Sequence, residues 1–207
     1  MTLEHIKLVA FDCDGVMFDT EQGNRFYYSD ILQHFGRPAI TDEQFGFVHM
    51  HTVHESMAYL FPDEHLLEAA HAFRKTMGYR KYLGYYTMEP QLVPLLDKLR
   101  PQIKTAVATN RTDTMDKLLA EFNLDDYFDL VVTSSDVKRP KPHPDALLKI
   151  LDHFGLAPHQ AIYIGDSQVD ELAAKAANMP LAAYRNRELT ADFYIDSLGE
   201  LEQLLDL

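Results

Sequence analysis

The sequence predicts an α/β fold in which a parallel sheet, with helices on both faces, is interrupted by an inserted helical domain. Two observations predict the sheet. Short and continuously apolar runs, typical of strands buried on both faces, recur along the chain. Segments of helical periodicity lie between these runs. A third observation predicts the insertion, because residues 20–87 contain no comparable strand run.

The predicted strands begin near the N-terminus and recur in the second half of the chain. They are Ile6–Phe11, Thr105–Thr109, Leu130–Thr133, Ala161–Gly165 and Leu181–Tyr184. Apolar residues spaced along one helix face mark the intervening segments, at 92–99, 115–122, 147–154 and 172–176. This alternation is typical of a parallel sheet, so residues 1–19 and 88–207 are assigned to one α/β core domain.

Residues 20–87 have the pattern of three or four helices. A first helix is predicted at Gln22–Phe35, ended by a following glycine and proline. A second is expected to begin at Thr41 or Asp42, and a third to run from Pro62 to about Tyr82, because proline suits a first helical turn. We expect this segment to be a domain inserted into the core, with its two junctions close together.

Composition and charge exclude several classes of partner. The 207 residues include 32 acidic and 19 basic side chains, for a net charge of −13. Such a charge repels phosphate backbones and anionic lipids, so we expect neither nucleic acid nor a membrane as partner. The single cysteine cannot form an internal disulfide, and no run reaches the roughly 18 apolar residues of a membrane span. The predicted location is the cytoplasm.

Polar side chains follow four of the predicted strands, where ligands bind in open parallel sheets. They are Asp12, Asp14 and Gly15 after the first strand, Thr109 and Asn110 at the second, Lys141 past the third, and Asp166 and Asp170 after the fourth. The carboxyl ends of parallel strands meet at one edge of a sheet. We therefore expect these carboxylates, hydroxyl and ammonium to converge on a single site.

This set of groups suits phosphoryl transfer. Asp12 and Asp166 offer the oxygen ligands that Mg²⁺ prefers. The Asp12 carboxylate could attack phosphorus and form an aspartyl-phosphate. Asp14 would protonate the leaving alcohol and then deprotonate the attacking water. Thr109 and Lys141 would hold phosphate oxygens among the crowded carboxylates.

The segment Asp12–Gly15 has a second interpretation as the start of a Ca²⁺ loop. Such a loop carries its glycine at the sixth position, whereas Gly15 is fourth here. The segment also follows a predicted strand and not a helix. We therefore place it in the phosphoryl-transfer site, where Gly15 leaves backbone N–H groups free to face an anion. Arg111, next to the second motif, is interpreted as a surface residue.

At these residues the sequence resembles the haloacid dehalogenase-like superfamily, in its phosphatase and phosphomutase branch. The resemblance rests on DCDGV at 12–16, Thr109-Asn110, Lys141 in KPHP, and GDSQVD at 165–170. It spans the chain from residue 12 to residue 170, and the helical segment after the first motif matches the subgroup with a helical cap. It implies a Rossmann-like core, an inserted helical cap over residues 20–87, and Mg²⁺ as cofactor.

The resemblance also implies a role for each motif residue. Asp12 is implied as nucleophile and Asp14 as acid/base, a pair typical of the phosphatases and not of the dehalogenating relatives. The implied metal ligands are Asp12, the backbone carbonyl of Asp14, Asp166 and, directly or through a water, Asp170. The implied phosphate-binding residues are Thr109, Asn110 and Lys141.

Residues of the inserted segment are expected to contact the rest of the substrate. The candidates are Arg25, His49 and His51. Sugar-phosphate mutase relatives carry a lysine and an arginine where this chain has His49 and Val53. We therefore expect water, and not a sugar hydroxyl, to accept the phosphoryl group.

The sequence thus predicts a Mg²⁺-dependent phosphatase of a small phosphate monoester, phosphoglycolate-like or a sugar monophosphate. A phosphomutase or phosphotransferase is the first alternative, since it would use the same core residues. A non-catalytic binding module on the same fold is the second.

Overall fold

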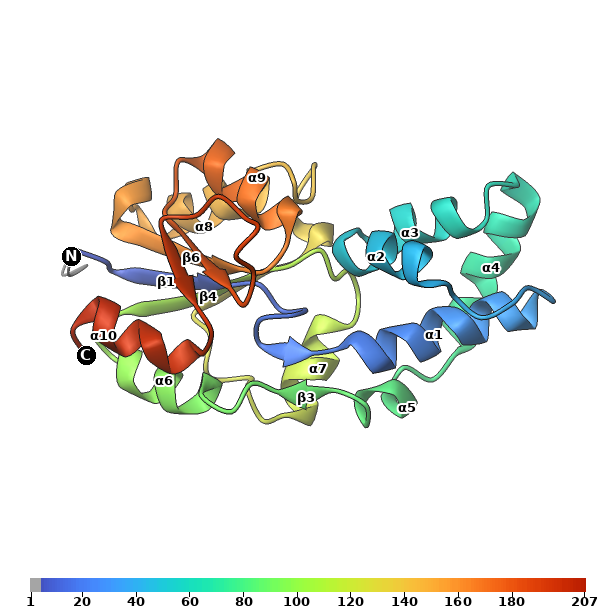
Figure 1. The fold of residues 1–207 in the computed structure, drawn as a ribbon, viewed down its shortest axis with the longest axis horizontal. Coiled ribbons are helices and arrows are strands. Elements are labelled where there is room, and N and C mark those ends of the chain that lie inside the picture. The colour runs from blue at the N-terminus through green and yellow to red at the C-terminus, as the bar shows by residue number, and fades with distance from the viewer. Residues whose placement is uncertain (1–4) are drawn as a thin grey trace. The chain divides into compact units, whose positions relative to one another are not determined.

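The computed structural model describes residues 5–207. The chain divides into two compact units (Figure 1). One consists of Met1–Phe18 and Met88–Leu207, and the other of Asp19–Thr87. The first is called the core unit below, and the second the helical unit.

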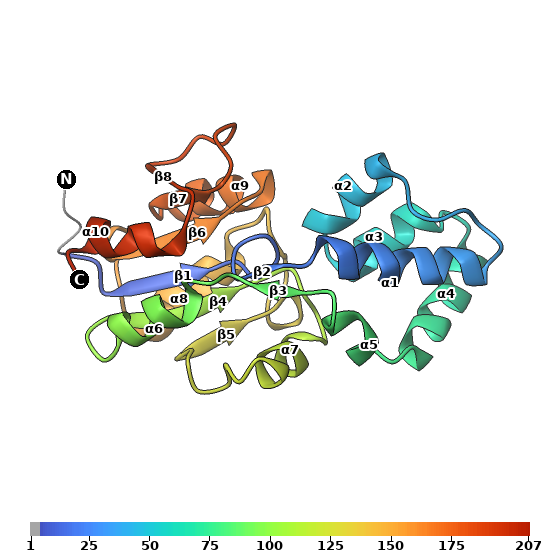
Figure 2. The same ribbon diagram turned by 60° about the horizontal axis from the view of Figure 1, so that its bottom comes forward.

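A parallel sheet of six strands forms the centre of the core unit, in the order β5-β4-β1-β6-β7-β8 (Figure 2). The strands are β1 (Leu8–Phe11), β4 (Lys104–Ala108), β5 (Leu130–Val132), β6 (Ala161–Gly165), β7 (Leu181–Tyr184) and β8 (Phe193–Ile195). Residue Leu8 of β1 lies opposite Lys104 on one side and Ala161 on the other. The first strand of the chain is therefore flanked by two strands formed about 100 and 150 residues later.

Helices cover both faces of this sheet (Figure 1). They are α6 (Leu92–Leu99), α7 (Met115–Glu121), α8 (Asp145–Phe154), α9 (Gln168–Ala177) and α10 (Leu201–Leu205). The helices α8 and α9 lie on one face, where the buried side chains of Leu147, Ile150 and Ala173 pack with Ala10 and Ala106 of the sheet. The helices α6 and α10 lie on the other face. The strands are buried on both sides, which is why they are apolar throughout.

The helical unit contains α1 (Glu21–His34), α2 (Asp42–Met50), α3 (Val53–Leu60), α4 (Glu64–Thr76) and α5 (Arg80–Leu83). Its own core includes Ile31, Phe45, Met57 and Phe61. The predicted start of the second helix is confirmed: Thr41 caps α2, accepting a hydrogen bond from the backbone N–H of Gln44.

One predicted helix of this unit is wrong in its bounds. The segment expected to run from Pro62 to Tyr82 forms two helices, α4 and α5. Asp63 caps α4 through the backbone N–H of Leu66, at 3.0 Å, so the proline lies outside the helix. Met77 then leaves the helical conformation, and Gly78, a poor helix former, follows it.

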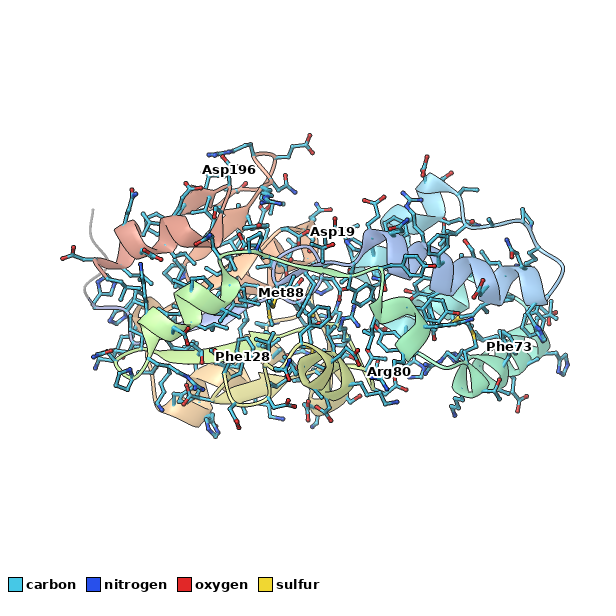
Figure 3. The ribbon with its side chains drawn as sticks, turned by 90° about the horizontal axis from the view of Figure 1, so that it is seen from below. Asp19, Phe73, Arg80, Met88, Phe128 and Asp196 are labelled. Carbon is cyan, nitrogen blue, oxygen red and sulfur yellow. The ribbon has the colours of Figure 1, made fainter. Side chains whose placement is uncertain are left out.

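Two short strands, β2 (Phe18–Asp19) and β3 (Thr87–Met88), carry the chain out of the core unit and back. They pair with each other in a separate two-stranded sheet. Figure 3 labels Asp19 and Met88, the last residues of these strands. The backbone N–H of Glu89, just after β3, donates to the carbonyl of Met17, just before β2, at 2.9 Å. This hydrogen bond joins the two segments that connect the units.

The predicted fold class, an α/β parallel sheet with an inserted helical segment, is confirmed. The strand β8 was not predicted from the sequence, because only Ile195 of its three residues is buried. Within residues 5–207, no helix has both the length and the apolar character needed to cross a membrane.

Candidate active site

Asp12 follows β1 at the carboxyl end of the central strand. Its backbone N–H donates to the carbonyl of Ile164 on β6 at 2.9 Å, which continues the pairing of the two strands. Its Oδ1 atom accepts from the backbone N–H of Cys13 at 2.7 Å and from the ammonium of Lys141 at 2.8 Å. The carboxylate is thus held in one orientation beside a cation.

Lys141 is 2% exposed, and three oxygens surround its ammonium. They belong to Asp12 at 2.8 Å, Asp170 at 2.7 Å and the hydroxyl of Tyr163 at 2.9 Å. An ammonium has three protons to donate, so these contacts use all of them. Burial lowers the pKa of Lys141, but the charges of Asp12 and Asp170 outweigh burial and raise it.

Asn110 fixes the backbone of Lys141. Its carboxamide accepts from the Lys141 N–H and donates to the Lys141 carbonyl, both at 3.0 Å. This reciprocal pair joins the end of β4 to the loop before α8. These two hydrogen bonds join the Asn110 carboxamide to the backbone that carries Lys141, and its predicted contact with phosphate stays a prediction.

Asp170 is fully buried at the first turn of α9. Its Oδ1 accepts from Lys141 and from Tyr163, and its Oδ2 accepts from the N–H and hydroxyl of Ser167. Burial raises the pKa of Asp170, but the charge and hydrogen bond of Lys141 outweigh it and lower the pKa below its usual value. With four donors around it, this carboxylate orients Lys141.

Asp12, Asp166 and Asp170 form the one cluster of potential metal-ligating groups found among the described residues. An oxygen of each lies within 4.8 Å of the other two. Burial raises the pKa of Asp12 to about 7, although Lys141 opposes the effect. Burial, with the charges of Asp170 and Asp12, raises the pKa of Asp166 well above its usual value. Negative charge exceeds positive charge at this point, and an all-oxygen set of this kind fits a hard divalent cation.

Gly15 lies against this cluster with φ of +83°, a left-handed conformation that favours glycine. A Cβ atom added there would overlap the carboxylate of Asp166. We expect Gly15→Ala to displace Asp166 and to lower kcat at least about 100-fold, since misplacement of a reacting group by about 1 Å has that effect.

Steady-state kinetics of Gly15→Ala beside Gly36→Ala test this expectation. Gly36 also has a positive φ, of +69°, but a Cβ there meets nothing within 4 Å. The control carries the same backbone strain without the collision. Equal losses of activity in the two variants would refute the role of the Gly15–Asp166 contact.

Asp14 is not one of the three clustered carboxylates, and it pairs with Arg111. The guanidinium Nε donates to Oδ2 at 2.7 Å, and Nη2 donates to Oδ1 at 2.6 Å. The side chain of Arg111 is 7% exposed. The interpretation of Arg111 as a surface residue is therefore wrong. Its partner stands 97 positions earlier in the chain, and the sequence gives no sign of the pairing.

Thr109 is buried at the end of β4. Its backbone N–H donates to the carbonyl of Val132 at 3.0 Å, and its hydroxyl accepts from the N–H of Arg111 at 3.1 Å. The strand β4 is the neighbour of β1, which places Thr109 at the same sheet edge as Asp12.

Tyr163 is a site residue that the sequence analysis missed. It lies inside β6, and its hydroxyl is within 2.9 Å of Lys141 and 2.7 Å of Asp170. A signal was present: a buried tyrosine in an aliphatic strand needs a hydrogen-bond partner for its hydroxyl.

The three candidates in the helical unit occupy two places. Arg25 pairs with Glu21 and Asp42 and lies over the ring of Phe45, at 4.0 Å from its centroid. His49 packs against the same ring, at 5.0 Å between centroids. Its Nδ1 atom is buried and has no hydrogen-bond partner among residues 5–207.

His51 belongs to a different group of side chains. It stacks on Phe47 at 3.9 Å, and its Nδ1 lies 2.8 Å from the Phe47 carbonyl. The structure thus brings Arg25 and His49 together on one ring and keeps His51 on another. Contact of any of the three with substrate stays a prediction.

The sequence was compared with models of known protein families. The model of the haloacid dehalogenase-like hydrolases matches residues 9–184, which include every residue of the candidate site described above. The chain belongs to the haloacid dehalogenase-like hydrolase family. The predicted resemblance and the predicted enzyme class, a hydrolase, are both confirmed.

Relatives within this family agree with the assignment. A phosphoglycolate phosphatase of Chromobacterium violaceum is 30% identical over 99% of both chains. A solved haloacid dehalogenase-superfamily hydrolase of subfamily IA from Geobacter sulfurreducens is 39% identical, with a TM-score of 0.80 over 99% of this chain and 98% of that one.

A β-phosphoglucomutase from Clostridium difficile shares the fold at a TM-score of 0.84, with 20% identity over 97% of both chains. A protein that carries the name of a mutase therefore shares this fold. The acceptor of the phosphoryl group has to be decided by the residues of the site and by experiment.

Proposed function

We propose that this protein is a Mg²⁺-dependent phosphatase of small phosphate monoesters that works through an aspartyl-phosphate on Asp12. One observation carries the proposal: the Asp12 carboxylate is fixed 2.8 Å from the buried ammonium of Lys141 at the carboxyl end of the central strand. A nucleophile and a cation held together in this way serve the attack on a phosphorus atom and the charge of the phosphoryl group.

In the proposed first step, an oxygen of Asp12 forms a bond to phosphorus as the bond to the substrate alcohol breaks. Asp14 gives its proton to the leaving oxygen. In the second step, water attacks the phosphorus of the aspartyl-phosphate, Asp14 takes a proton from that water, and inorganic phosphate leaves. Thr109 holds a phosphate oxygen. Lys141 would exchange its contact with Asp12 for a contact with a phosphate oxygen, and Asn110 keeps the Lys141 backbone in place.

The residues that would hold Mg²⁺ are Asp12, Asp166 and the backbone carbonyl of Asp14. Asp170, whose oxygens already accept four hydrogen bonds, would act through Lys141 or through a metal-bound water. The bound cation supplies electrostatic stabilisation of the negative charge that develops on the transferred phosphoryl group. Burial raises the pKa values of both Asp12 and Asp166, and a cation bound beside these carboxylates would oppose that effect.

The proposed substrate class is a small phosphorylated metabolite, with 2-phosphoglycolate as the first candidate. Relatives that carry the name phosphoglycolate phosphatase support this choice, including one that aligns with 99% of this chain. A mutase would use the same core residues. Where mutases carry a lysine and an arginine, we propose that His49 and Arg25, which both contact the ring of Phe45, face the substrate of this protein.

A screen of phosphorylated metabolites for phosphate release, with Mg²⁺ present, tests the proposed function. Release from 2-phosphoglycolate or a sugar monophosphate, together with release from p-nitrophenyl phosphate, is the expected result. Isomer formation with negligible phosphate release would establish a mutase. Binding of these compounds without any turnover would establish a non-catalytic module.

Addition of Mg²⁺ to chelator-treated protein is expected to raise its melting temperature and to restore activity. A ligand at about 100 times its Kd adds about 2.7 kcal/mol of stability, which for a chain of this size corresponds to roughly 5–10 °C. We expect Asp166→Asn to lose this shift and Asp152→Asn, an exposed residue of α8, to keep it. An equal shift in both variants would exclude Asp166 as a ligand.

A further inference from the structure

The pairing of Arg111 with Asp14 joins two loops of the core unit. Both guanidinium contacts are short, at 2.6 and 2.7 Å, and they run in parallel to the two oxygens of one carboxylate. This bidentate geometry fixes the plane of the carboxylate as well as its position. The side chains of Asp14 and Arg111 are 15% and 7% exposed, so little water competes for the pair.

Arg111 is itself held from several sides. Its Nη1 donates to the hydroxyl of Thr114 at 3.2 Å, and its backbone N–H donates to Thr109 at 3.1 Å. Its carbonyl accepts from the N–H and the hydroxyl of Ser134. An arginine anchored along its backbone and at its guanidinium can impose an orientation on its partner, whereas a solvated one cannot.

We propose that Arg111 is the positioning residue for the acid/base Asp14. This inference rests on the proposed function. Asp14 stands directly before Gly15, whose φ is +83°, and its carboxylate is not part of the cluster formed by Asp12, Asp166 and Asp170. Arg111 places this carboxylate where it can exchange a proton with the leaving oxygen and later with water. The guanidinium acts through Asp14 and takes no part in bond making.

If Arg111 positions Asp14, the effect of replacing Arg111 should depend on the leaving group of the substrate. General-acid help matters most when the leaving alcohol is weakly acidic, and little when the leaving group departs readily as an anion. Phenol is a weaker acid than p-nitrophenol, so phenyl phosphate needs more help from a general acid than p-nitrophenyl phosphate does. Both esters carry a phosphate group on a phenyl ring. The ratio of their kcat/KM values therefore reports proton transfer during formation of the aspartyl-phosphate.

The experiment measures kcat/KM on both esters for Arg111→Gln, Arg111→Lys, Asp14→Asn and the double variant Asp14→Asn/Arg111→Gln. Arg187→Gln is the matched control, because Arg187 pairs with Asp196 on the surface of the same unit. General acid–base catalysis contributes about 10²–10⁴-fold. We expect Arg111→Gln to lose on the order of 10–100-fold on phenyl phosphate and less than about threefold on p-nitrophenyl phosphate.

Three further results complete the expectation. Arg111→Lys keeps the charge but not the bidentate geometry, so it loses nearly as much as Arg111→Gln. In the Asp14→Asn background, Arg111→Gln has little additional effect, because the two residues act as one unit. Arg187→Gln keeps the wild-type rates on both esters.

Other outcomes overturn the proposal. Equal losses on the two esters with raised KM would make Arg111 a phosphate-binding residue. Equal losses with a lowered melting temperature, additive to Asp14→Asn, would make it a structural residue only. If the wild type hydrolyses neither ester with Mg²⁺, the proposed function fails and the role of Arg111 fails with it.

Discussion

Asp12→Asn is expected to lower kcat by more than about 1,000-fold, which corresponds to about 4 kcal/mol of activation free energy. The amide has nearly the shape of the carboxylate and can still accept from the N–H of Cys13. The fold should therefore persist. An amide is a poor nucleophile and a poor ligand for Mg²⁺, so both proposed roles of Asp12 are lost together.

Phosphate release from p-nitrophenyl phosphate and thermal unfolding, measured on the same preparation, check this result. Asp152→Asn is the control, because it makes the same chemical change at an exposed position of α8. If Asp12→Asn kept more than about a tenth of the wild-type kcat, a loss of only about 1.4 kcal/mol, Asp12 could not be the nucleophile.

Lys141→Met has the largest expected effect on stability. Methionine fills much of the same volume but leaves Asp12 and Asp170 without their shared cation. Removing one partner from a buried ion pair costs about 3–5 kcal/mol. In a chain of this length the melting temperature should fall by about 6–20 °C, and hydrolysis should be lost as well.

Lys104→Met is the matched control, because Lys104 pairs with Asp129 at a half-exposed position of the same unit. A pair of that kind contributes at most about 1 kcal/mol. The double variant Lys141→Met/Asp170→Asn should recover part of the lost stability, since it also removes one of the two carboxylates, Asp12 and Asp170, that lose their cation in Lys141→Met. A melting temperature for Lys141→Met no lower than that of Lys104→Met would show that the buried network contributes little to folding.

The sheet was predictable because its strands are buried on both faces and are therefore read directly as apolar runs. β8 escaped prediction for the opposite reason. It lies at the edge of the sheet, Phe193 is half-buried and Tyr194 is exposed, so its sequence carries no continuous apolar run.

The candidate site was predictable where a residue follows a strand, since the topology then fixes its place. This reasoning located Asp12, Thr109 and Asp166 at one edge. It could not find Arg111, whose partner Asp14 lies 97 residues away in the sequence. Nor could it find Tyr163, whose hydroxyl contacts buried Lys141 from the middle of a strand. Pairings between distant loops have no local signature in a single sequence.

The position of β1 at the centre of the sheet has a consequence for the newly made chain. Its two neighbours are β4 and β6, and the latter ends at Gly165. At about 5–20 residues per second, a ribosome needs roughly 8–30 s to go from Asp12 to that glycine. Throughout this time β1, which leads to Asp12, has at least one open edge, whereas residues 19–87 are complete about halfway through it. The helical segment can therefore fold during synthesis, and the catalytic edge is assembled among the last parts of the molecule.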